Sequence, residues 1–425
     1  MFLGSVDSSG LKIMNSSPFI VGDELITDVV IVGGGLAGLT LACALGGAGV
    51  PTVCVDRDSP KTQTTENFDI RTTAVSFSSQ QVLAAAGVWN DMVNGAAAIN
   101  DIRVADKDSP FFVHYNFQEV GDHPLGWVLD NIVMRRALFA RVAELPALTH
   151  LAPATVAQIE RSPAGAVTVL TDGRRIRSRL IVGADGRPSL CRRLAGIGVM
   201  RYDYGQNAIV CTIGHEKPHH GLAVEHFLPA GPFALLPLPD NRTSIVWSER
   251  RALAPTYVSL PDDQFLYELQ RRAGDHLGAL HLVGGRTHYP LSIMFAERHI
   301  DQRLALIGEA AHAIHPIAGQ GLNMGLRDVA ALAETVVDCF RLGLDVGAPG
   351  VLTRYQQWRR FDNTLLAVVC DSLVRLFSNN FPPLRIARNL GLGAVQQLPP
   401  LKQFFMKHAM GVVGECPRMT RGEPV

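Results

Sequence analysis

The chain has 425 residues, of which 47% are hydrophobic and 18% are charged, a balance typical of globular rather than disordered proteins. Its 39 Lys and Arg residues match 39 Asp and Glu residues, so no excess of positive charge points to a nucleic-acid partner. The seven cysteines show no CxxC pair and no spacing of metal ligands, which predicts a protein of the reducing cytoplasm without a metal site. No apolar run reaches the roughly 18 residues that cross a bilayer. A chain of this length favours two domains.

The first 27 residues contain three acidic side chains, no Arg and no long apolar core. This composition argues against a secretory signal and against a transit peptide. Residues 1–27 are therefore interpreted as a poorly ordered N-terminal extension, with Met14 as an alternative start of the protein.

The first expected core element is a buried strand over residues 28–32, followed at once by a glycine-rich turn and a helix. The turn has the pattern GxGxxG, formed by Gly33, Gly35 and Gly38, and the next strand ends in Asp56. In such a unit the glycines let the backbone approach a pyrophosphate, and the acid accepts hydrogen bonds from an adenosine ribose. The carboxylate disfavours a 2′-phosphate, so FAD or NAD is expected rather than NADP.

Two later segments carry side chains that suit the same kind of ligand. Arg71 could form two parallel hydrogen bonds to a phosphate, or it could form a salt bridge at the surface. The sequence alone favours neither role over the other. A strand over residues 179–182 ends in Gly-Ala-Asp-Gly, which puts Asp185 where a sugar–phosphate ligand would bind. The alternative for Asp185 is a simple Asp-Gly turn.

Between about residues 200 and 295 the pattern changes to alternating strands, with one helix over 263–272. This pattern predicts a sheet domain inserted between the parts of the nucleotide-binding domain. Its apolar and aromatic face would form a roof over an aromatic substrate, although packing within the sheet core explains the same residues equally well.

A glycine-rich loop late in the chain repeats the order of strand, loop and helix. Residues 304–307 form a short apolar strand, Gly319 and Gly321 allow an unusual backbone path, and helical spacing follows. The unpaired N–H groups of such a helix start suit an anionic or electron-rich ligand. His312 and His315 lie in this loop without a third ligand nearby, so structural or cofactor-adjacent roles are expected rather than a metal site.

The tail over residues 372–414 contains five Lys or Arg residues, no Asp or Glu, and many apolar side chains between the basic ones. Such a segment can hold a protein on an anionic membrane surface. It can equally be a C-terminal helical layer that packs on the core. The two alternatives are nearly even and do not exclude each other.

Three motifs, in their order and spacing, resemble those of the class A flavin-dependent aromatic hydroxylases, and the resemblance covers nearly the whole chain from residue 28. Within that class the sequence is similar to the ubiquinone-biosynthesis hydroxylases. The three class motifs are Gly33–Gly38 with Asp56, the segment 183–186, and the loop from Gly308 to Asp328. The segments typical of the narrower family are 69–76, 231–238, 312–321 and the region around 399–411.

The resemblance implies FAD as the cofactor. One position departs from the family, because Glu309 stands where Asp is common, and its extra methylene moves the carboxylate by about 1.5 Å. The residues expected on this basis to contact FAD are Gly33, Gly35, Leu36, Ala37, Gly38, Asp56, Arg57, Arg71, Arg135, Asp185, Glu309, Gly319, Gly321, Leu322 and Asn323.

The resemblance also implies the reaction. NAD(P)H or a reductase partner reduces FAD, dioxygen adds to form a flavin hydroperoxide, and its distal oxygen is transferred to a phenol ring. The implied substrate is a polyprenylated phenol of ubiquinone biosynthesis, which favours a peripheral place on the inner face of the membrane and a quinone-biosynthesis complex. The sequence identifies no catalytic side chain, ring position or oligomeric state. Two alternatives are a flavin hydroxylase of a soluble aromatic compound and a non-catalytic FAD-binding subunit of a quinone-synthesis complex.

The expected fold class is α/β with an α+β insertion: a Rossmann-like FAD-binding domain, an inserted mixed β-sheet substrate domain and a C-terminal helical region. The FAD-binding domain is expected over residues 28–100, 150–195 and 296–345, and the substrate domain over 101–149 and 196–295. The C-terminal helical, membrane-associating region is expected over residues 346–425.

Overall fold

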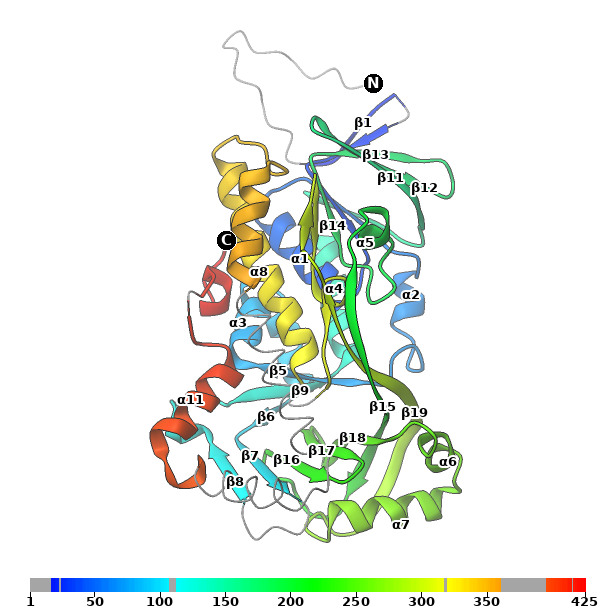
Figure 1. The fold of residues 1–425 in the computed structure, drawn as a ribbon, viewed down its shortest axis with the longest axis vertical. Coiled ribbons are helices and arrows are strands. Elements are labelled where there is room, and N and C mark those ends of the chain that lie inside the picture. Colours follow the sequence, from blue (N-terminus) through cyan, green and yellow to red (C-terminus); the bar gives the residue numbers. More distant parts are fainter. Residues whose placement is uncertain (1–16, 23, 107–111, 317–318, 361–394, 415) are drawn as a thin grey trace.

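The computed structural model describes residues 17–22, 24–106, 112–316, 319–360, 395–414 and 416–425. These residues form an elongated molecule (Figure 1). A domain built of layers of sheets and helices forms one end, and a large sheet forms the other. Several sheets of mixed type, with helices between and beside them, agree with the expected α/β class. No helix in the described ranges is long and apolar enough to span a membrane.

A six-stranded sheet forms the centre of the first domain. Its strands, in spatial order, are β10 (Leu148–Leu151), β4 (Thr52–Val55), β3 (Val29–Val32), β14 (Leu180–Gly183), β21 (Leu304–Leu306) and β20 (Ile300–Asp301). All neighbours are parallel except β20 and β21. Every side chain of β3 and β4 is buried, because layers cover both faces of the sheet.

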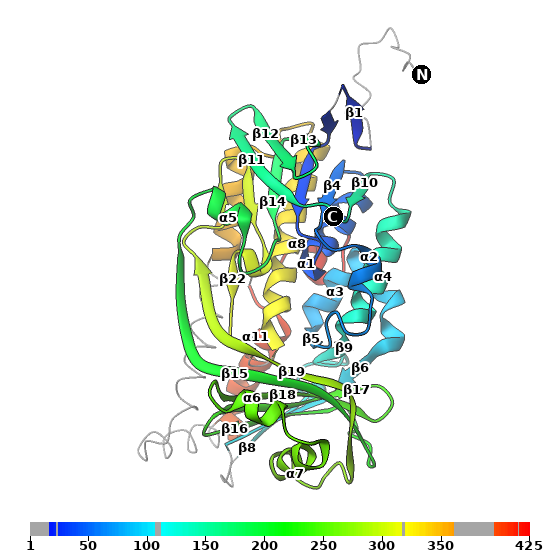
Figure 2. The ribbon, with the colours of Figure 1, turned by 90° about the vertical axis from the view of Figure 1, so that its right-hand side faces the viewer.

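Three helices cover one face of this sheet in a single apolar core (Figure 2). They are α1 (Leu36–Gly47), α4 (Asn131–Glu144) and α8 (Gln320–Arg341). The position of α4 corrects the expected division, which assigned residues 101–149 to the substrate domain. Met134 and Leu138 lie one helical turn apart and are fully buried in the core shared with α1 and α8. Helical periodicity predicts which face of α4 is buried, but it does not predict which sheet or helices that face packs against.

A five-stranded sheet covers the opposite face of the central sheet. Its strands, in order, are β1 (Phe19–Val21), β2 (Glu24–Ile26), β13 (Arg175–Ser178), β12 (Gly165–Leu170) and β11 (Val156–Ser162). Residues 19–21 and 24–26 thus form strands within the segment 1–27, which was expected to be poorly ordered. The strand β2 pairs in parallel with β13, and Glu24 forms ion pairs with Arg175 at 3.1 Å and Arg177 at 2.7 Å. These partners lie about 150 residues away in the sequence, so the local composition could not indicate them.

An eight-stranded mixed sheet forms the other end of the molecule (Figure 1). In order, its strands are β22 (His312–Ala313), β19 (Leu280–Ala296), β15 (Val199–His215), β18 (Arg242–Arg250), β17 (Gly231–Leu238), β16 (Leu222–Leu228), β7 (Asp101–Asp106) and β8 (Phe112–Asn116). The helices α6 (Ala254–Val258) and α7 (Asp262–Ala273) cover its outer face. The inner face is turned toward the start of α8.

The strands β15 and β19 have 17 residues each and pair with each other along their whole length. They form a curved ribbon that runs from the central sheet into the eight-stranded sheet (Figure 2). Their register shifts twice, between Asp203 and Gln206 and between Cys211 and Thr212. The ribbon thus connects the two ends of the molecule.

A small three-stranded sheet lies between the two larger units (Figure 1). Its strands are β5 (Thr72–Ser76), β9 (Gly126–Asp130) and β6 (Ala96–Ile99), and α3 (Phe77–Ala85) follows β5. The Oγ1 atom of Thr72 donates a hydrogen bond to Oγ of Ser244 in β18 at 2.6 Å. This bond joins the small sheet to the eight-stranded one.

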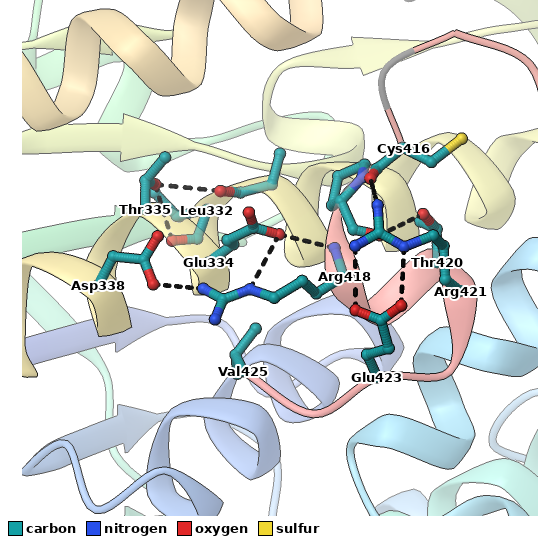
Figure 3. Close-up of polar contacts among 12 residues, drawn as sticks. Leu332, Glu334, Thr335, Asp338, Cys416, Arg418, Thr420, Arg421, Glu423 and Val425 are labelled. Carbon is teal, nitrogen blue, oxygen red and sulfur yellow. Dashed lines mark hydrogen bonds and ion pairs between the residues drawn. The ribbon is translucent and has the colours of Figure 1, made fainter.

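The C-terminal region contains the helix α11 (Pro399–Met410) and a closing 3-10 turn, η6 (Arg418–Arg421). Residues 372–394 of the basic, apolar tail expected over 372–414 lie outside the described residues. The last residues pack against α8 (Figure 3), where the Arg418 guanidinium pairs with Glu334 and Asp338. Glu334 also accepts a bond from the Arg418 backbone at 2.6 Å. The end of the chain thus stabilises the helix that begins at the glycine-rich loop.

Candidate active site

The turn between β3 and α1 needs glycine at two positions for steric reasons. Gly33 has φ +108°, and a side chain there would overlap the backbone of Ala184 at the end of β14. A side chain on Gly38 would overlap the carbonyl oxygen of Gly33. Gly35 differs, because its φ is −75° and no atom lies within 4 Å of where its Cβ would be. The N-terminus of α1 has no side-chain cap, so its N–H groups face open space that a pyrophosphate fits.

Asp56, at the end of β4, lies against this turn. Its carboxylate accepts hydrogen bonds from the backbone nitrogens of Gly34 at 2.5 Å and Asp58 at 2.8 Å. These bonds fix the carboxylate beside the glycine-rich turn, in the place expected for a ribose partner. Arg57 points into solvent and pairs with Asp58 at 3.2 Å. Leu36 and Ala37 form the first turn of α1.

The two arginines expected at the cofactor share one acidic partner, Asp69. Arg71 donates two hydrogen bonds to it, at 2.7 and 2.8 Å, and Arg135 donates one at 3.2 Å. Asn131 adds a fourth bond at 2.9 Å. Burial alone would raise the pKa of Asp69, but these donors lower it to about 2. The structure therefore has Arg71 in the ion-pair alternative, and contact of either arginine with a phosphate stays a prediction.

Asp185 follows β14 and closes the other side of the turn. Its Oδ2 atom accepts bonds from the backbone nitrogens of Leu190 at 2.7 Å and Cys191 at 3.0 Å, which fixes the start of α5 (Leu190–Leu194). Its Oδ1 atom is buried and has no partner within the described part of the chain. A buried carboxylate oxygen without a donor fits a ligand hydroxyl. Glu309 faces the same loop, with Oε1 3.4 Å from Nη2 of Arg187.

The start of α8 is fixed to β5 by the Asn323 side chain. Its Oδ1 accepts the N–H of Ser76 at 2.9 Å, while Nδ2 donates to the carbonyl oxygens of Ala74 and Gly319, both at 2.9 Å. The amide thus bonds to the protein itself, although the resemblance implies that Asn323 contacts FAD. Contact of this turn with a ligand would come from the backbone.

The glycines of this turn differ from each other in the same way as those before α1, since one is required for steric reasons and the other borders open space. Gly319 has φ +63°, and its Cβ would lie 2.7 Å from that of Ala74, so the fold requires glycine there. Gly321 has no atom within 4 Å of its Cβ position and borders open space. Leu322 is partly buried and packs on the core below the turn. The open space in front of Gly321 is the place where these residues fit a flavin ring.

A buried charge cluster behind this loop was not predicted from the sequence. Asp328 is fully buried in α8 and accepts bonds from the backbone nitrogen of Gly308 at 3.0 Å, Nε2 of His312 at 2.6 Å and Nε of Arg359 at 2.8 Å. Burial would raise the pKa of Asp328, but His312 and Arg359 hold it well below its usual value. Asp328 ends the third sequence motif, so the sequence indicated the residue itself but not the groups that bond to its carboxylate.

His312 therefore has a structural partner. Within the described ranges, no group of three His, Cys, Asp or Glu side chains could hold a metal ion. His315 is buried, and its ring lies edge-on to Tyr204 with 5.3 Å between the ring centroids. Burial lowers the pKa of His315 to about 4, so its ring is neutral at physiological pH.

A cluster of packed, buried apolar side chains, called here the apolar compartment, lies between the eight-stranded sheet and the start of α8. It consists of Val113 from β8, Phe227 from β16, Ile314 after β22, and Met324 in the first turns of α8. Its walls thus come from the inner face of the sheet and from both ends of the glycine-rich loop. These contacts fit the alternative of packing within the sheet core, and the apolar roof over an aromatic substrate stays a prediction.

Comparisons with known proteins agree with this geometry. A family model described as "FAD binding domain" matches residues 26–360. Ubiquinone hydroxylase UbiL of Rhodospirillum rubrum is 49% identical over 405 residues, which cover 95% of this chain and 94% of the relative. The 3-demethoxyubiquinol 3-hydroxylase of Escherichia coli is 33% identical over 388 residues, 91% of this chain and 99% of the relative.

A solved structure shares the fold. The structure of p-nitrophenol 4-monooxygenase PnpA from Pseudomonas putida matches with a TM-score of 0.76 at 18% identity, covering 92% of this chain and 99% of the other. At that identity the likeness shows the architecture alone. The family model and the two hydroxylase relatives carry the assignment further. This chain belongs to the FAD-dependent aromatic monooxygenases, within the family of ubiquinone-biosynthesis hydroxylases.

Proposed function

We propose that this protein hydroxylates the aromatic ring of a polyprenylated phenol in ubiquinone biosynthesis, using FAD and dioxygen. The names of its relatives, a ubiquinone hydroxylase and a 3-demethoxyubiquinol 3-hydroxylase, support this substrate class. The observation that carries the proposal is the apolar inner face of the eight-stranded sheet, which packs against the glycine-rich loop and the start of α8. An electron-rich ring bound there would lie directly against the loop expected to hold the flavin.

The residues around the two glycine-rich turns would hold the cofactor. The N-terminus of α1 would bind the pyrophosphate, Asp56 the ribose, and the backbone near Gly321 the ring system. When bound, FAD supplies the redox chemistry that activates dioxygen, with electrons from NAD(P)H or a reductase partner. The partial positive charge at the start of α8 favours negative charge on the ring. The apolar walls exclude water from the reacting atoms.

The helix α11 is the described part of the tail for which two alternatives were given, docking on the core and binding to the inner face of the membrane. Its inner side is apolar, with Met406 and Met410 buried one turn apart. Lys402 is also buried and pairs with Glu119 at 2.7 Å, so this basic residue holds the helix on the protein rather than binding lipid. The helix is therefore docked on the core, which is one of the two alternatives for this segment.

The outer side of α11 supports the other alternative as well. Phe404 is 53% exposed and Phe405 is 40% exposed, and Lys407 follows them in the helix. Aromatic side chains next to a basic one can enter the interface of an anionic membrane. The helix lies at the end of the molecule that contains the eight-stranded sheet (Figure 1), which is where a bilayer-resident substrate would have to enter.

The proposed reaction is tested by metabolite analysis in cells that lack the gene. Loss of the protein should cause a prenylated ring compound lacking one hydroxyl to accumulate, and the wild-type gene should restore the product. Purified protein should bind FAD and become yellow. Protein that stays colourless after FAD is added would contradict the enzyme assignment. Normal quinone levels, together with turnover of a soluble phenol, would favour hydroxylation of a soluble aromatic compound instead.

Membrane binding is tested by flotation of the purified protein with vesicles containing anionic lipid. The double substitution Phe404→Ser and Phe405→Ser should reduce the floated fraction several-fold. The matched control is Leu342→Ser, because Leu342 is 73% exposed and lies at the C-terminal end of α8 rather than on α11. Equal flotation of both folded variants would remove α11 from the proposal.

A further inference from the structure

The strand β16 presents one acidic side chain to the inner face of the eight-stranded sheet. Side chains alternate along a strand, so Glu225 shares a face with Phe227, while Val224 and His226 face the other way. Val224 packs in the core beneath α7, which identifies its side as the outer face. Phe227 packs against Ile314 in the apolar compartment, which identifies the side of Glu225 as the inner face.

The neighbours of Glu225 across the sheet are apolar. In register, Val104 of β7 lies on one side of it and Ala234 of β17 on the other. Val104 packs in the same apolar compartment as Phe227. Residues two apart on a strand are separated by about 7 Å, so Glu225 lies at the edge of this compartment. The described part of the chain contains no hydrogen bond or ion pair to the Glu225 carboxyl.

A carboxyl group without partners is costly to bury unless something binds to it. Glu225 is half-buried, yet its surroundings desolvate the carboxyl and raise its pKa to about 8. The carboxyl thus keeps some accessible surface although its neighbours in the sheet are apolar. No nearby charge contributes to this shift. An acid–base group with apolar neighbours on both adjacent strands thus lies on the inner face of the sheet.

We propose that Glu225 binds the phenolic hydroxyl of the substrate and accepts its proton during hydroxylation. This inference rests on the proposed function. The substrate O–H bond breaks, a carboxyl O–H bond forms on Glu225, and the electron pair left on oxygen increases the electron density of the ring. The proton returns to the same oxygen when the hydroxylated ring regains its aromatic form and its ring C–H proton is lost to water. Such a group works best when its pKa lies near the operating pH.

Other titratable groups near the inner face must be distinguished from Glu225. Asp106 of β7 lies in register with Phe227, and Tyr115 belongs to β8. Burial raises the pKa of Tyr115 to about 12, outside the working range. From the cofactor side, His315 stays neutral at physiological pH. His226, the neighbour of Glu225 on the same strand, faces α7 and provides a matched control.

The test uses the FAD-loaded enzyme, Glu225→Gln, Glu225→Asp and the control His226→Asn, with a short-chain prenylated phenol. We expect Glu225→Gln to keep its bound flavin and nearly the wild-type KM, and to lose on the order of 100-fold in kcat. In the wild type, kcat should increase as the pH passes through about 8, and this step should disappear in Glu225→Gln. Glu225→Asp should restore part of the rate, and His226→Asn should keep the wild-type profile.

A second readout does not depend on turnover. Ultraviolet difference spectra of the bound phenol report its ionised fraction, which should respond to pH differently in the wild type and in Glu225→Gln. Identical spectra, or a wild-type kcat and pH profile in Glu225→Gln, would overturn the role of Glu225. If the wild type binds the phenol but never hydroxylates it, the proposed function fails, whereas the spectra still test the proton transfer.

Discussion

The carboxylate of Asp328 lies 2.6 Å from Nε2 of His312, and neither side chain is accessible to solvent. The same carboxylate accepts the backbone N–H of Gly308 and a bond from Arg359. One buried acid thus fixes both the strand end and the helix that form the cofactor loop. Removing one partner of a buried charge pair leaves the other uncompensated, so this cluster is sensitive to substitution.

The first prediction concerns Asp328→Asn. This change keeps the shape of the side chain but removes the charge that Arg359 faces. We expect the free energy of unfolding to fall by about 3–5 kcal/mol, with loss of bound FAD. Chemical denaturation followed by flavin fluorescence measures both. The control is Glu144→Gln, because Glu144 is 62% exposed in its pair with Arg141 and its loss should cost under about 1 kcal/mol. Equal stability of the two variants would contradict the assigned role.

The second prediction concerns the pH dependence of stability through Asp69. Its pKa is lowered from 3.8 to about 2 in the folded protein, so its contribution is present above about pH 4 and is lost as the pH falls toward 2. The shift corresponds to about 2 kcal/mol. Asp69→Asn should be less stable than the wild type by roughly that amount at pH 7, and urea denaturation should show the difference shrinking below pH 4. A difference that does not change with pH would show that packing, rather than charge, is responsible.

The third prediction separates two kinds of glycine in the first turn. Gly38→Ala should prevent correct folding of the turn, because the added methyl group overlaps the Gly33 carbonyl. Gly35→Ala should fold with a wild-type Tm, because its Cβ enters open space, yet it should bind FAD at least 10-fold more weakly. Circular dichroism reports the fold and flavin absorbance the binding. Full flavin binding by a folded Gly35→Ala variant would mean that the pyrophosphate lies elsewhere.

The fourth prediction concerns Glu309. Its contact with Arg187 at 3.4 Å is long and 47% of its side chain is exposed, so Glu309→Asp should change the free energy of unfolding by less than about 1 kcal/mol. If the carboxylate points at the cofactor, the shorter side chain should keep or tighten FAD binding. Titration with FAD measures the dissociation constant. A large loss of flavin at unchanged stability would show that the longer side chain has another role.

Local patterns in the sequence were sufficient for the strands and helices that surround the cofactor. The first motif is short, because it consists of the apolar run at residues 29–32, the glycines after it and Asp56. The spacing of these residues was therefore enough to predict the strand, the turn and the helix. The same holds for β21 and the loop before α8. The positive φ of Gly319 agrees with the unusual backbone path expected there.

Contacts between distant segments could not be predicted in this way. Arg359 reaches Asp328 across 31 residues, and β2 pairs with β13 from about 150 residues away. Arg135 reaches Asp69 across 66 residues, so the acidic partner that it shares with Arg71 could not be predicted either. No pattern in the sequence indicated a role for Glu225. An acidic residue in an alternating strand is expected to face solvent unless the buried face of the sheet is known.

The paired strands β15 and β19 restrict how the two ends of the molecule can move. A two-stranded ribbon with a continuous ladder resists bending, so a hinge between the ends must use its irregular points. Those points are the register shifts near Gly205, which has φ +67°, and at Cys211. The second lies within the eight-stranded sheet, where β15 also pairs with β18, so the first is the softer of the two. A change in the angle between the two ends would therefore bend the ribbon near Gly205 and move the inner face of the sheet, including Glu225, as a unit.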